Sequence, residues 1–219
     1  MKRIFFLLAL AMLALFSVAC ANDTTKQTPQ TAAKTTYTNS LAGKKILVAY
    51  FSATNNTKRV AEEIAQATGA DIYRIEAAQS YSANPYDDKD LIQKEAYENL
   101  RPEVKAPLPA SEMAKYDVIF VGSPIWWHQP AMVVCTFLEG YDLSGKTIVP
   151  FFTYGARSYL NESMQRIYKS TPNSVHVPAS LPKDIEPDNI QQSQNDDDGI
   201  IMPADVDNID TWLKVLQLK

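Results

Sequence analysis

Residues 46–51 form an apolar run that is followed at once by a cluster of hydroxyl and amide side chains, and then by a helical pattern. Such a short and nearly continuous apolar run predicts a strand that is buried on both faces of a parallel sheet. The apolar spacing of residues 60–65 predicts a helix with one buried face. A strand that leads through short polar residues into a helix is typical of a phosphate-binding loop, because free N–H groups and the helix dipole attract an anion.

The polar cluster also has a simpler interpretation, since the same residue types are preferred as helix caps. One residue is enough for a cap, so five polar residues within six positions favour an anion site. The run contains neither Gly-x-Gly-x-x-Gly nor Gly-Lys-Ser/Thr, which argues against a dinucleotide fingerprint and an ATP-type phosphate loop. The candidate anion-binding residues are Ser52, Thr54, Asn55, Asn56 and Thr57.

The run Phe-Ser-Ala-Thr-Asn-Asn-Thr-Lys-Arg-Val-Ala, which begins at Phe51, resembles the FMN phosphate loop of the flavodoxin family. The family pattern is Ser/Thr-x-Thr-Gly-x-Thr directly after the first strand, and Asn55 stands where most members have Gly. Asn tolerates a left-handed backbone better than most residues, so we expect the loop conformation to be kept. The resemblance implies that this loop holds the phosphate of FMN.

Four more segments have strand patterns, and helical patterns alternate with them along the chain. Residues 71–76 alternate as an edge strand would, while residues 116–122, 146–152 and 174–178 are candidates for the other strands. Alternation of this kind predicts a doubly wound α/β domain with five parallel strands in a three-layer sandwich. The flavodoxin resemblance implies the strand order 2-1-3-4-5.

Two further loops follow predicted strands, and ligands bind at the carboxyl ends of strands in such sheets. The segment 123–130 offers a rigid Pro, two adjacent indoles and exposed amides, which suit the isoalloxazine ring of FMN. Core packing is the alternative for large aromatics, but two adjacent tryptophans cannot both face one core, so we expect at least one to be exposed. By resemblance, the ring-binding residues are Ser123, Pro124, Ile125, Trp126, Trp127, Thr153, Tyr154 and Gly155.

The segment 79–109 is a long excursion that carries Tyr81, Tyr86 and a predicted helix near residues 88–100. It is either a wall or lid over the cofactor or a surface helix of a crossover connection, and the sequence leaves both open. Its end, Arg101-Pro102-Glu103, resembles a flavodoxin-like subfamily that is common in bacteria.

Residues 1–20 predict a targeting segment with two basic residues followed by an apolar stretch that is short for a membrane span. Small residues before Cys20 resemble a bacterial lipoprotein signal, which implies that Cys20 carries lipid and anchors the chain to a membrane. The alternative is an ordinary secretory peptide cut near Ala19 or Ala21. Both predict an exported protein of the bacterial cell envelope, secreted if no lipid is added.

Residues 21–40 are rich in Thr, Gln, Ala and Lys, which predicts a flexible tether. Residues 41–219 are long enough for one domain with its own core, and residues 180–203 are expected to be a solvated insertion. The net charge of −4 argues against a nucleic-acid partner.

The first hypothesis for function is an FMN-binding electron-transfer protein whose redox partner is unknown. It requires no catalytic acid or base, because the cofactor carries the chemistry. The second hypothesis is an FMN-dependent NAD(P)H:quinone or flavin reductase, with a second pocket roofed by the segment 79–109. The third is a binding lipoprotein that keeps the fold without flavin.

Overall fold

The computed structural model describes residues 40–82, 84–154, 159–178, 199–201 and 209–218. The predictions made for the signal segment with Cys20, for the tether up to residue 39, for Gly155 and for residues 180–198 and 202–203 of the insertion lie outside these residues. None of the helices in the described part is both long enough and apolar enough to cross a bilayer.

Five parallel strands form the body of the sheet in the order β2-β1-β3-β5-β6, which confirms the predicted order 2-1-3-4-5 when only these strands are counted. They are β1 (Ile46–Tyr50), β2 (Asp71–Arg74), β3 (Val118–Trp126), β5 (Thr147–Tyr154) and β6 (Val175–His176). Two short strands were not predicted and join the sheet in the antiparallel sense. These are β4 (Gln129–Pro130), which pairs with β3, and β7 (Gly199–Ile201), which pairs with β5.

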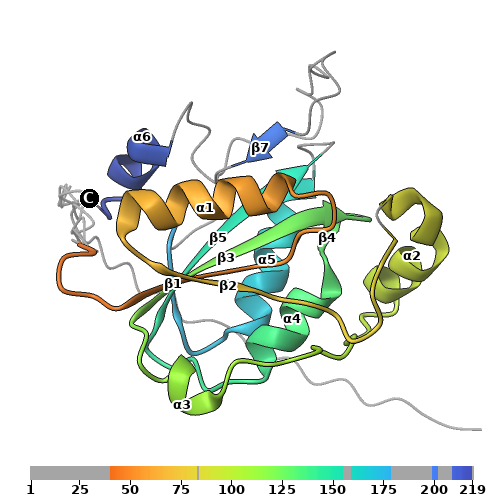
Figure 1. Ribbon diagram of the computed structural model, residues 1–219, viewed down its shortest axis with the longest axis horizontal. Helices are drawn as coiled ribbons and strands as arrows, with labels where there is room; N and C mark the ends of the chain where they lie inside the picture. The colour runs from red at the N-terminus through yellow and green to blue at the C-terminus, as the bar shows by residue number, and fades with distance from the viewer. Residues whose placement is uncertain (1–39, 83, 155–158, 179–198, 202–208, 219) are drawn as a thin grey trace, which may run out of the picture. The chain divides into compact units, whose positions relative to one another are not determined.

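Helices cover both faces of the sheet and complete the predicted three-layer sandwich (Figure 1). The helices α1 (Asn56–Thr68) and α6 (Ile209–Val215) pack on one face. The other face carries α4 (Met132–Glu139), α5 (Leu160–Ser170) and the short α3 (Ala110–Met113). The excursion after β2 contains the 3-10 turn η1 (Pro85–Asp88) and α2 (Lys89–Tyr97), which lies beside the carboxyl ends of the strands (Figure 1).

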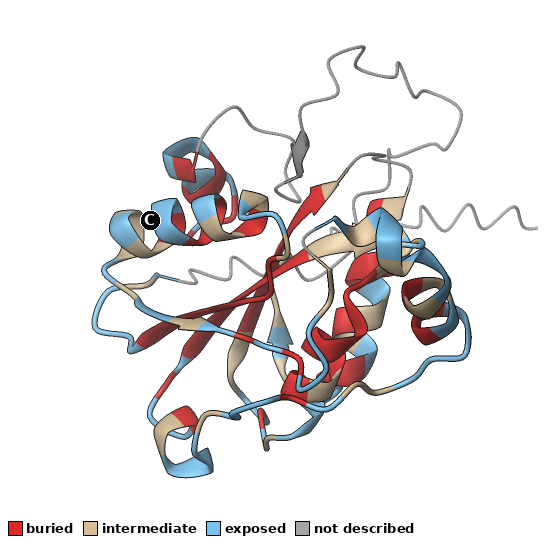
Figure 2. Cartoon of the chain, turned by 45° about the vertical axis from the view of Figure 1, so that its right-hand side comes forward, coloured by how far each residue is buried: buried red, intermediate tan, exposed pale blue. Residues whose placement is uncertain are grey.

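The central strands are buried on both faces, as their apolar runs predict (Figure 2). Side chains of β1 alternate between two core clusters: Leu47 packs toward α4 and α5, and Val48 packs toward α1 and α6. The strand β2 lies at one edge of the sheet, where Ile72 is 46% exposed, in agreement with its edge-strand pattern.

The structure extends two strands beyond their predicted ends. The strand β3 continues through residues 123–126, which were expected to be loop, and β5 continues through Thr153 and Tyr154. In the extension of β3, Ser123 pairs with Phe152 and Pro124 pairs with Thr153 of the β5 extension, so a neighbouring strand supports a segment whose own composition is typical of loops.

Candidate functional site

The loop between β1 and α1 has the geometry of an open helix N-terminus. Asn55 precedes α1 with a φ of 69°, so it holds the left-handed conformation expected at this position. Its side chain makes no capping hydrogen bond to the helix. The first N–H groups of a helix have no intrahelical acceptor, so this end of α1 can donate to an anion.

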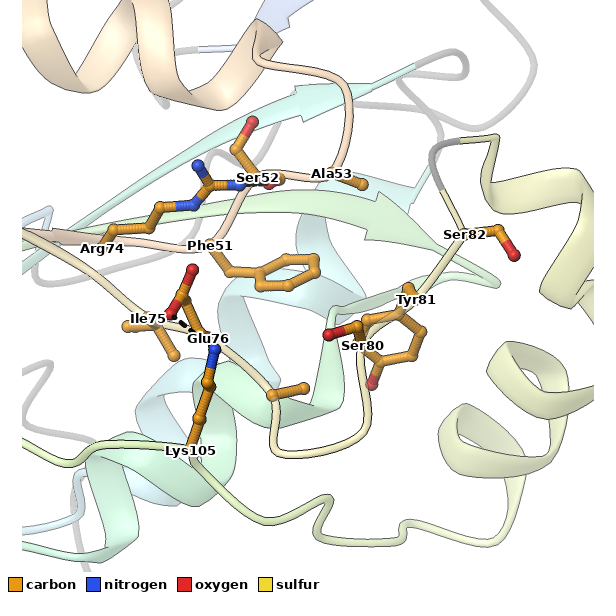
Figure 3. A pocket seen from close by; sticks show the side chains of 11 residues that line it. Phe51, Ser52, Ala53, Arg74, Ile75, Glu76, Ser80, Tyr81, Ser82 and Lys105 are labelled. Atoms are coloured by element: carbon orange, nitrogen blue, oxygen red, sulfur yellow. Dashed lines mark hydrogen bonds and ion pairs between the residues drawn. The ribbon is translucent and has the colours of Figure 1, made fainter.

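Ser52 is the most informative residue of this loop. It is 2% exposed, and its Oγ has no hydrogen-bond partner among the residues that the structure describes. Buried hydroxyls are nearly always paired, so such an orphan requires an explanation. Figure 3 shows the hydroxyl pointing away from the Phe51 ring. A ligand oxygen at the start of α1 would supply the missing partner, so the residues present fit a bound phosphate.

The loop is tied to the end of β5 by a buried hydrogen bond. Thr57 Oγ1 lies 2.8 Å from Thr153 Oγ1, and both side chains are buried. Two residues predicted to hold different parts of the ligand are therefore in direct contact. Thr54 is exposed and accepts a hydrogen bond from Asn56 Nδ2 at 3.2 Å.

The predicted ring-binding loop is a β-hairpin. Ile125 pairs with Pro130 and Trp126 pairs with Gln129, which leaves Trp127 and His128 as a two-residue turn. Their φ angles are 48° and 68°. Two-residue hairpin turns need positive φ and favour Asn and Gly, so Trp and His are unusual in this turn.

Ser123 supports the base of this hairpin. It is fully buried, and its Oγ donates to the Pro124 carbonyl at 2.8 Å and accepts from the Ala131 N–H at 2.9 Å. Its hydroxyl is thus engaged within the protein, unlike that of Ser52. Ile125 is half-buried and packs against the core cluster that faces α4 and α5.

The two adjacent tryptophans have different environments. Trp126 is half-buried and meets the rings of Phe51 and Tyr81 edge-on, with centroids 5.3 and 5.2 Å away. Trp127 is 38% exposed at the turn and contacts Tyr97 of α2 at 6.1 Å between centroids. The expectation that at least one of them is exposed is confirmed, and Trp127 is the one with free indole surface.

Residues of α5 and of the segment after α2 hold the turn in place. The His128 ring stacks on Tyr159 with centroids 3.6 Å apart. Arg166 donates to Gln129 Oε1 at 2.8 Å and to Asn99 Oδ1 at 2.7 Å. Trp and His disfavour the backbone conformation of this turn, and these contacts hold them in it. Strained conformations that neighbouring residues maintain are common at functional sites.

The third predicted group lies at the end of β5. Thr153 and Tyr154 are its last two residues, and their backbones pair with Ile200 and Gly199 of β7. The Thr153 side chain is buried and that of Tyr154 is half-buried. Because β1, β3 and β5 are parallel, all three groups come to the same edge of the sheet.

The excursion 79–109 contributes a wall to this edge. Tyr81 lies within ring contact of Phe51 and Trp126, and its hydroxyl donates to Glu95 of α2 at 2.7 Å. Glu95 is 6% exposed, and this burial raises the pKa of its carboxyl. Burial and the Glu95 hydrogen bond also raise the pKa of Tyr81. The sequence did not single out Tyr81 or Glu95 as a pair, because only the fold brings them together.

A small cavity of about 120 Å³ lies where β1 and β2 end (Figure 3). It is smaller than the roughly 300 Å³ at which drug-sized ligand pockets begin. Polar and charged residues from three segments line it, namely Ser52, Arg74, Glu76, Ser80, Ser82 and Lys105.

The sequence alone does not single out Arg74. It is the last residue of β2, and its Nη2 donates to the Ser52 carbonyl at 3.0 Å. No local pattern connects the two residues, because β1 and β2 become neighbours only in the sheet.

Similar structures were found for most of the domain. A provisionally assigned flavoprotein from Bacteroides eggerthii DSM 20697 is 37% identical over 61% of this chain and 84% of its own, with a TM-score of 0.53. A second provisionally assigned flavoprotein, from Bacteroides uniformis ATCC 8492, is 34% identical over 61% of this chain and 88% of its own, with a TM-score of 0.52.

A more distant structure shares the fold. It is a flavoprotein in complex with FMN from Lactobacillus acidophilus NCFM, 23% identical over 61% of this chain and 90% of its own, with a TM-score of 0.51. A comparison with curated proteins gave no match. The family model described as flavodoxin matches residues 45–193, a range that includes all three groups of candidate site residues. By this match, which spans more than half of its length, the chain belongs to the flavodoxin family.

Proposed function

We propose that this protein binds FMN and transfers electrons in the bacterial cell envelope. The observation that carries the proposal is the orphaned hydroxyl of Ser52, which lies in a phosphate-type loop at an open helix N-terminus. The family match supports the same ligand, and the Lactobacillus acidophilus flavoprotein of the same fold is a complex with FMN.

The phosphate would be held by the loop between β1 and α1, where hydroxyls, amides and free backbone N–H groups gather. The residues proposed for this task are Ser52, Thr54, Asn55, Asn56 and Thr57. The ring would be held by the hairpin and the end of β5, through Pro124, Ile125, Trp126, Trp127, Thr153, Tyr154 and Gly155. Ser123 serves these residues by fixing the hairpin from within.

Trp127 is the residue that we assign to stacking on the ring. Its indole is 38% exposed, whereas Trp126 is engaged edge-on by two other rings. Aromatic pairs prefer offset-stacked or edge-to-face arrangements, and an exposed indole on a fixed turn offers a flat face for stacking.

When bound, FMN supplies the redox chemistry, accepting and returning electrons one or two at a time. The residues of the chain bind and orient the cofactor and limit the access of water. Phe51, Tyr81 and Trp126 form an apolar wall on one side of the phosphate loop. The Tyr81 hydroxyl is neutral near pH 7 at its ordinary pKa of 10, and burial raises this pKa further, so the wall carries no negative charge at this residue.

One observation favours the reductase as a second candidate function. The cavity beside the phosphate loop is lined by Ser80, Tyr81, Ser82 and Lys105 of the segment 79–109, where a pocket for a second substrate was expected. Steady-state oxidation of NADH or NADPH by the FMN-loaded protein with a quinone would establish the reductase. A protein that is reduced only by another protein or by dithionite is an electron carrier.

FMN binding is tested by titrating the full chain with FMN while following tryptophan fluorescence. We expect one site per chain and strong quenching that is reduced in Trp127→Phe. Trp212→Phe is the matched control, because Trp212 is fully buried in the core on the α1 and α6 face. Fluorescence that is unchanged by FMN in the wild-type protein would contradict the proposal.

We propose further that lipid on Cys20 anchors the protein and that a redox protein or a membrane quinone is its partner. The support is the sequence pattern of residues 1–20, which lie outside the described part of the chain. We expect Cys20→Ser to move the protein from the membrane fraction to the soluble fraction of the envelope. Retention of the variant in membranes would show that another feature anchors it.

A further inference from the structure

Arg74 occupies a special position behind the phosphate loop. Its guanidinium donates to the Ser52 carbonyl at 3.0 Å, and Figure 3 shows it beside the Ser52 backbone. In the part of the chain that the structure describes, no carboxylate lies within ion-pair distance of Arg74. An arginine that is bound to a loop carbonyl and carries no partner charge leaves a net positive charge at this loop.

The other cations near the start of α1 are already paired. Lys58 Nζ lies 3.6 Å from Glu62, and Arg59 lies 3.9 Å from Glu63, each one helical turn away. Their charges are partly balanced within the helix. Lys105, which lines the same cavity, is paired as well, with its Nζ 3.8 Å from Glu76. Arg74 is therefore the cation beside this loop whose charge no carboxylate of the described residues balances at ion-pair distance, and this charge favours an anion there.

The hydrogen bond from Arg74 also fixes the orientation of a peptide group. In a trans peptide the C=O and N–H point in opposite directions. Because the Ser52 carbonyl is directed at Arg74, the N–H of Ala53 is directed away from it. This N–H donates no hydrogen bond within the described residues, so it joins the Ser52 hydroxyl as a second free donor of the loop.

We propose that Arg74 is a positioning residue that makes the site selective for a flavin with a phosphate over one without. It holds the Ser52–Ala53 peptide with its N–H available to the phosphate, and its charge favours the dianion. The inference rests on the proposed binding of FMN and deepens it. Riboflavin has the same ring and ribityl chain but no phosphate, so it gains nothing from this arrangement.

The test compares the dissociation constants of FMN and riboflavin for the full chain, measured by fluorescence titration. We expect Arg74→Gln to weaken FMN binding roughly 10-fold or more, the range of one or two hydrogen bonds to a charged group, and to change riboflavin binding less than about twofold. The FMN affinity of Arg74→Lys should lie between those of the wild type and Arg74→Gln, because Lys keeps the positive charge but lacks the planar guanidinium. Arg59→Gln is the matched control on α1 and should leave the ratio of the two constants near the wild-type value.

A second readout uses inorganic phosphate and the protein without flavin. Phosphate should raise the melting temperature of the wild-type protein and of Arg59→Gln but not that of Arg74→Gln, because a ligand stabilises only the state that binds it. If Arg74→Gln weakens FMN and riboflavin equally, or leaves the phosphate effect intact, Arg74 only supports the loop and the inference is wrong. Failure of the wild-type protein to bind either flavin would instead overturn the proposed function.

Discussion

At the scale of a single residue, the hydroxyl of Ser52, which is buried and unpaired among the described residues, lowers the stability of the flavin-free protein. A buried hydroxyl without a partner has lost its water and gained nothing in return. We predict that Ser52→Ala leaves the flavin-free protein as stable as the wild type or stabilises it by up to about 1 kcal/mol. The same change should weaken FMN binding by about 1.5–3 kcal/mol, the range for a hydrogen bond to a charged group.

Ser123→Ala is the control for this prediction, because Ser123 is equally buried but its hydroxyl makes two hydrogen bonds. It should lower the free energy of unfolding by about 1–3 kcal/mol, since it removes both hydrogen bonds of this buried hydroxyl and leaves the Ala131 N–H with only its longer bond to the Pro124 carbonyl at 3.3 Å. Urea unfolding of both variants without flavin makes the comparison. Equal destabilisation by the two changes would mean that the Ser52 hydroxyl is satisfied within the protein.

Glu95 gives the protein a predictable dependence of stability on pH. Burial raises the pKa of its carboxyl in the folded protein above the ordinary value of 4.5. The folded state then holds this proton more tightly than the unfolded chain, so the Glu95 contribution is most favourable below the unfolded pKa and is lost as pH rises through the folded pKa.

We predict that Glu95→Gln is at least as stable as the wild type at pH 7, because Gln keeps an oxygen for the Tyr81 hydroxyl without a buried charge. The advantage of the variant should shrink toward acidic pH, where Glu95 is protonated. Urea unfolding of both proteins between pH 4 and pH 8 measures the difference. If the stability of Glu95→Gln relative to the wild type grew toward acidic pH, the pKa of Glu95 would be lowered in the folded protein and not raised.

At this scale the sequence predicts residue types better than residue partners. The polar cluster before α1 is visible in the sequence itself, and the left-handed conformation of Asn55 agrees with its place at a Gly position of the family pattern. Arg74 and Ser52 are 22 residues apart, and Tyr81 and Glu95 are 14 apart. No periodicity links such pairs, so only the fold shows that they meet.

The hairpin formed by β3 and β4 shows how tertiary pairing overrides local preference at the scale of elements. The sequence predicts a loop after residue 122, since Ser-Pro begins it and Trp-His is not a recognised turn signal. In the fold, β5 lies alongside and pairs with Ser123 and Pro124, which continues the strand. Tyr159, directly before α5, stacks on His128 of the turn, and Arg166 of α5 binds Gln129 beside it, so the turn is held in a conformation that isolated chains avoid.

The close packing of β3 between β1 and β5 leaves no room at Gly122. A Cβ added there would lie 2.3 Å from Phe151 Cζ and 2.9 Å from Tyr50 Cβ. We predict that Gly122→Ala lowers the free energy of unfolding by at least about 1–3 kcal/mol, the usual cost of overpacking a core. Because Gly122 directly precedes the hairpin, FMN affinity should fall as well.

Gly140→Ala is a suitable control, since Gly140 has a helical backbone and its added Cβ would meet only the Phe137 carbonyl at 3.3 Å and a second carbonyl beyond it. It should change stability by less than about 1 kcal/mol. Thermal unfolding followed by circular dichroism compares the two variants. A Gly122→Ala protein as stable as the control would mean that the sheet relaxes without cost.

At the scale of the whole molecule, the layers follow from the alternation of strand and helix patterns, whereas the sheet order was implied by the resemblance to the flavodoxin family. The same alternation places three loops at one end of the sheet, where the family resemblance had placed the candidate residues for the phosphate and the ring. The buried bond between Thr57 and Thr153 shows that two of these groups meet. The wall formed by the segment 79–109 depends on long-range packing, so the sequence alone did not decide between a wall and a surface helix.

The measurement that bears most directly on this account is the visible absorption spectrum of the purified full chain after incubation with FMN and removal of free flavin. We expect flavin bands in a ratio of one FMN per chain, which bleach on reduction with dithionite and return in air. A folded protein that passes through the same procedure colourless, with no change in its spectrum at any FMN concentration, would contradict the assignment of this site to flavin.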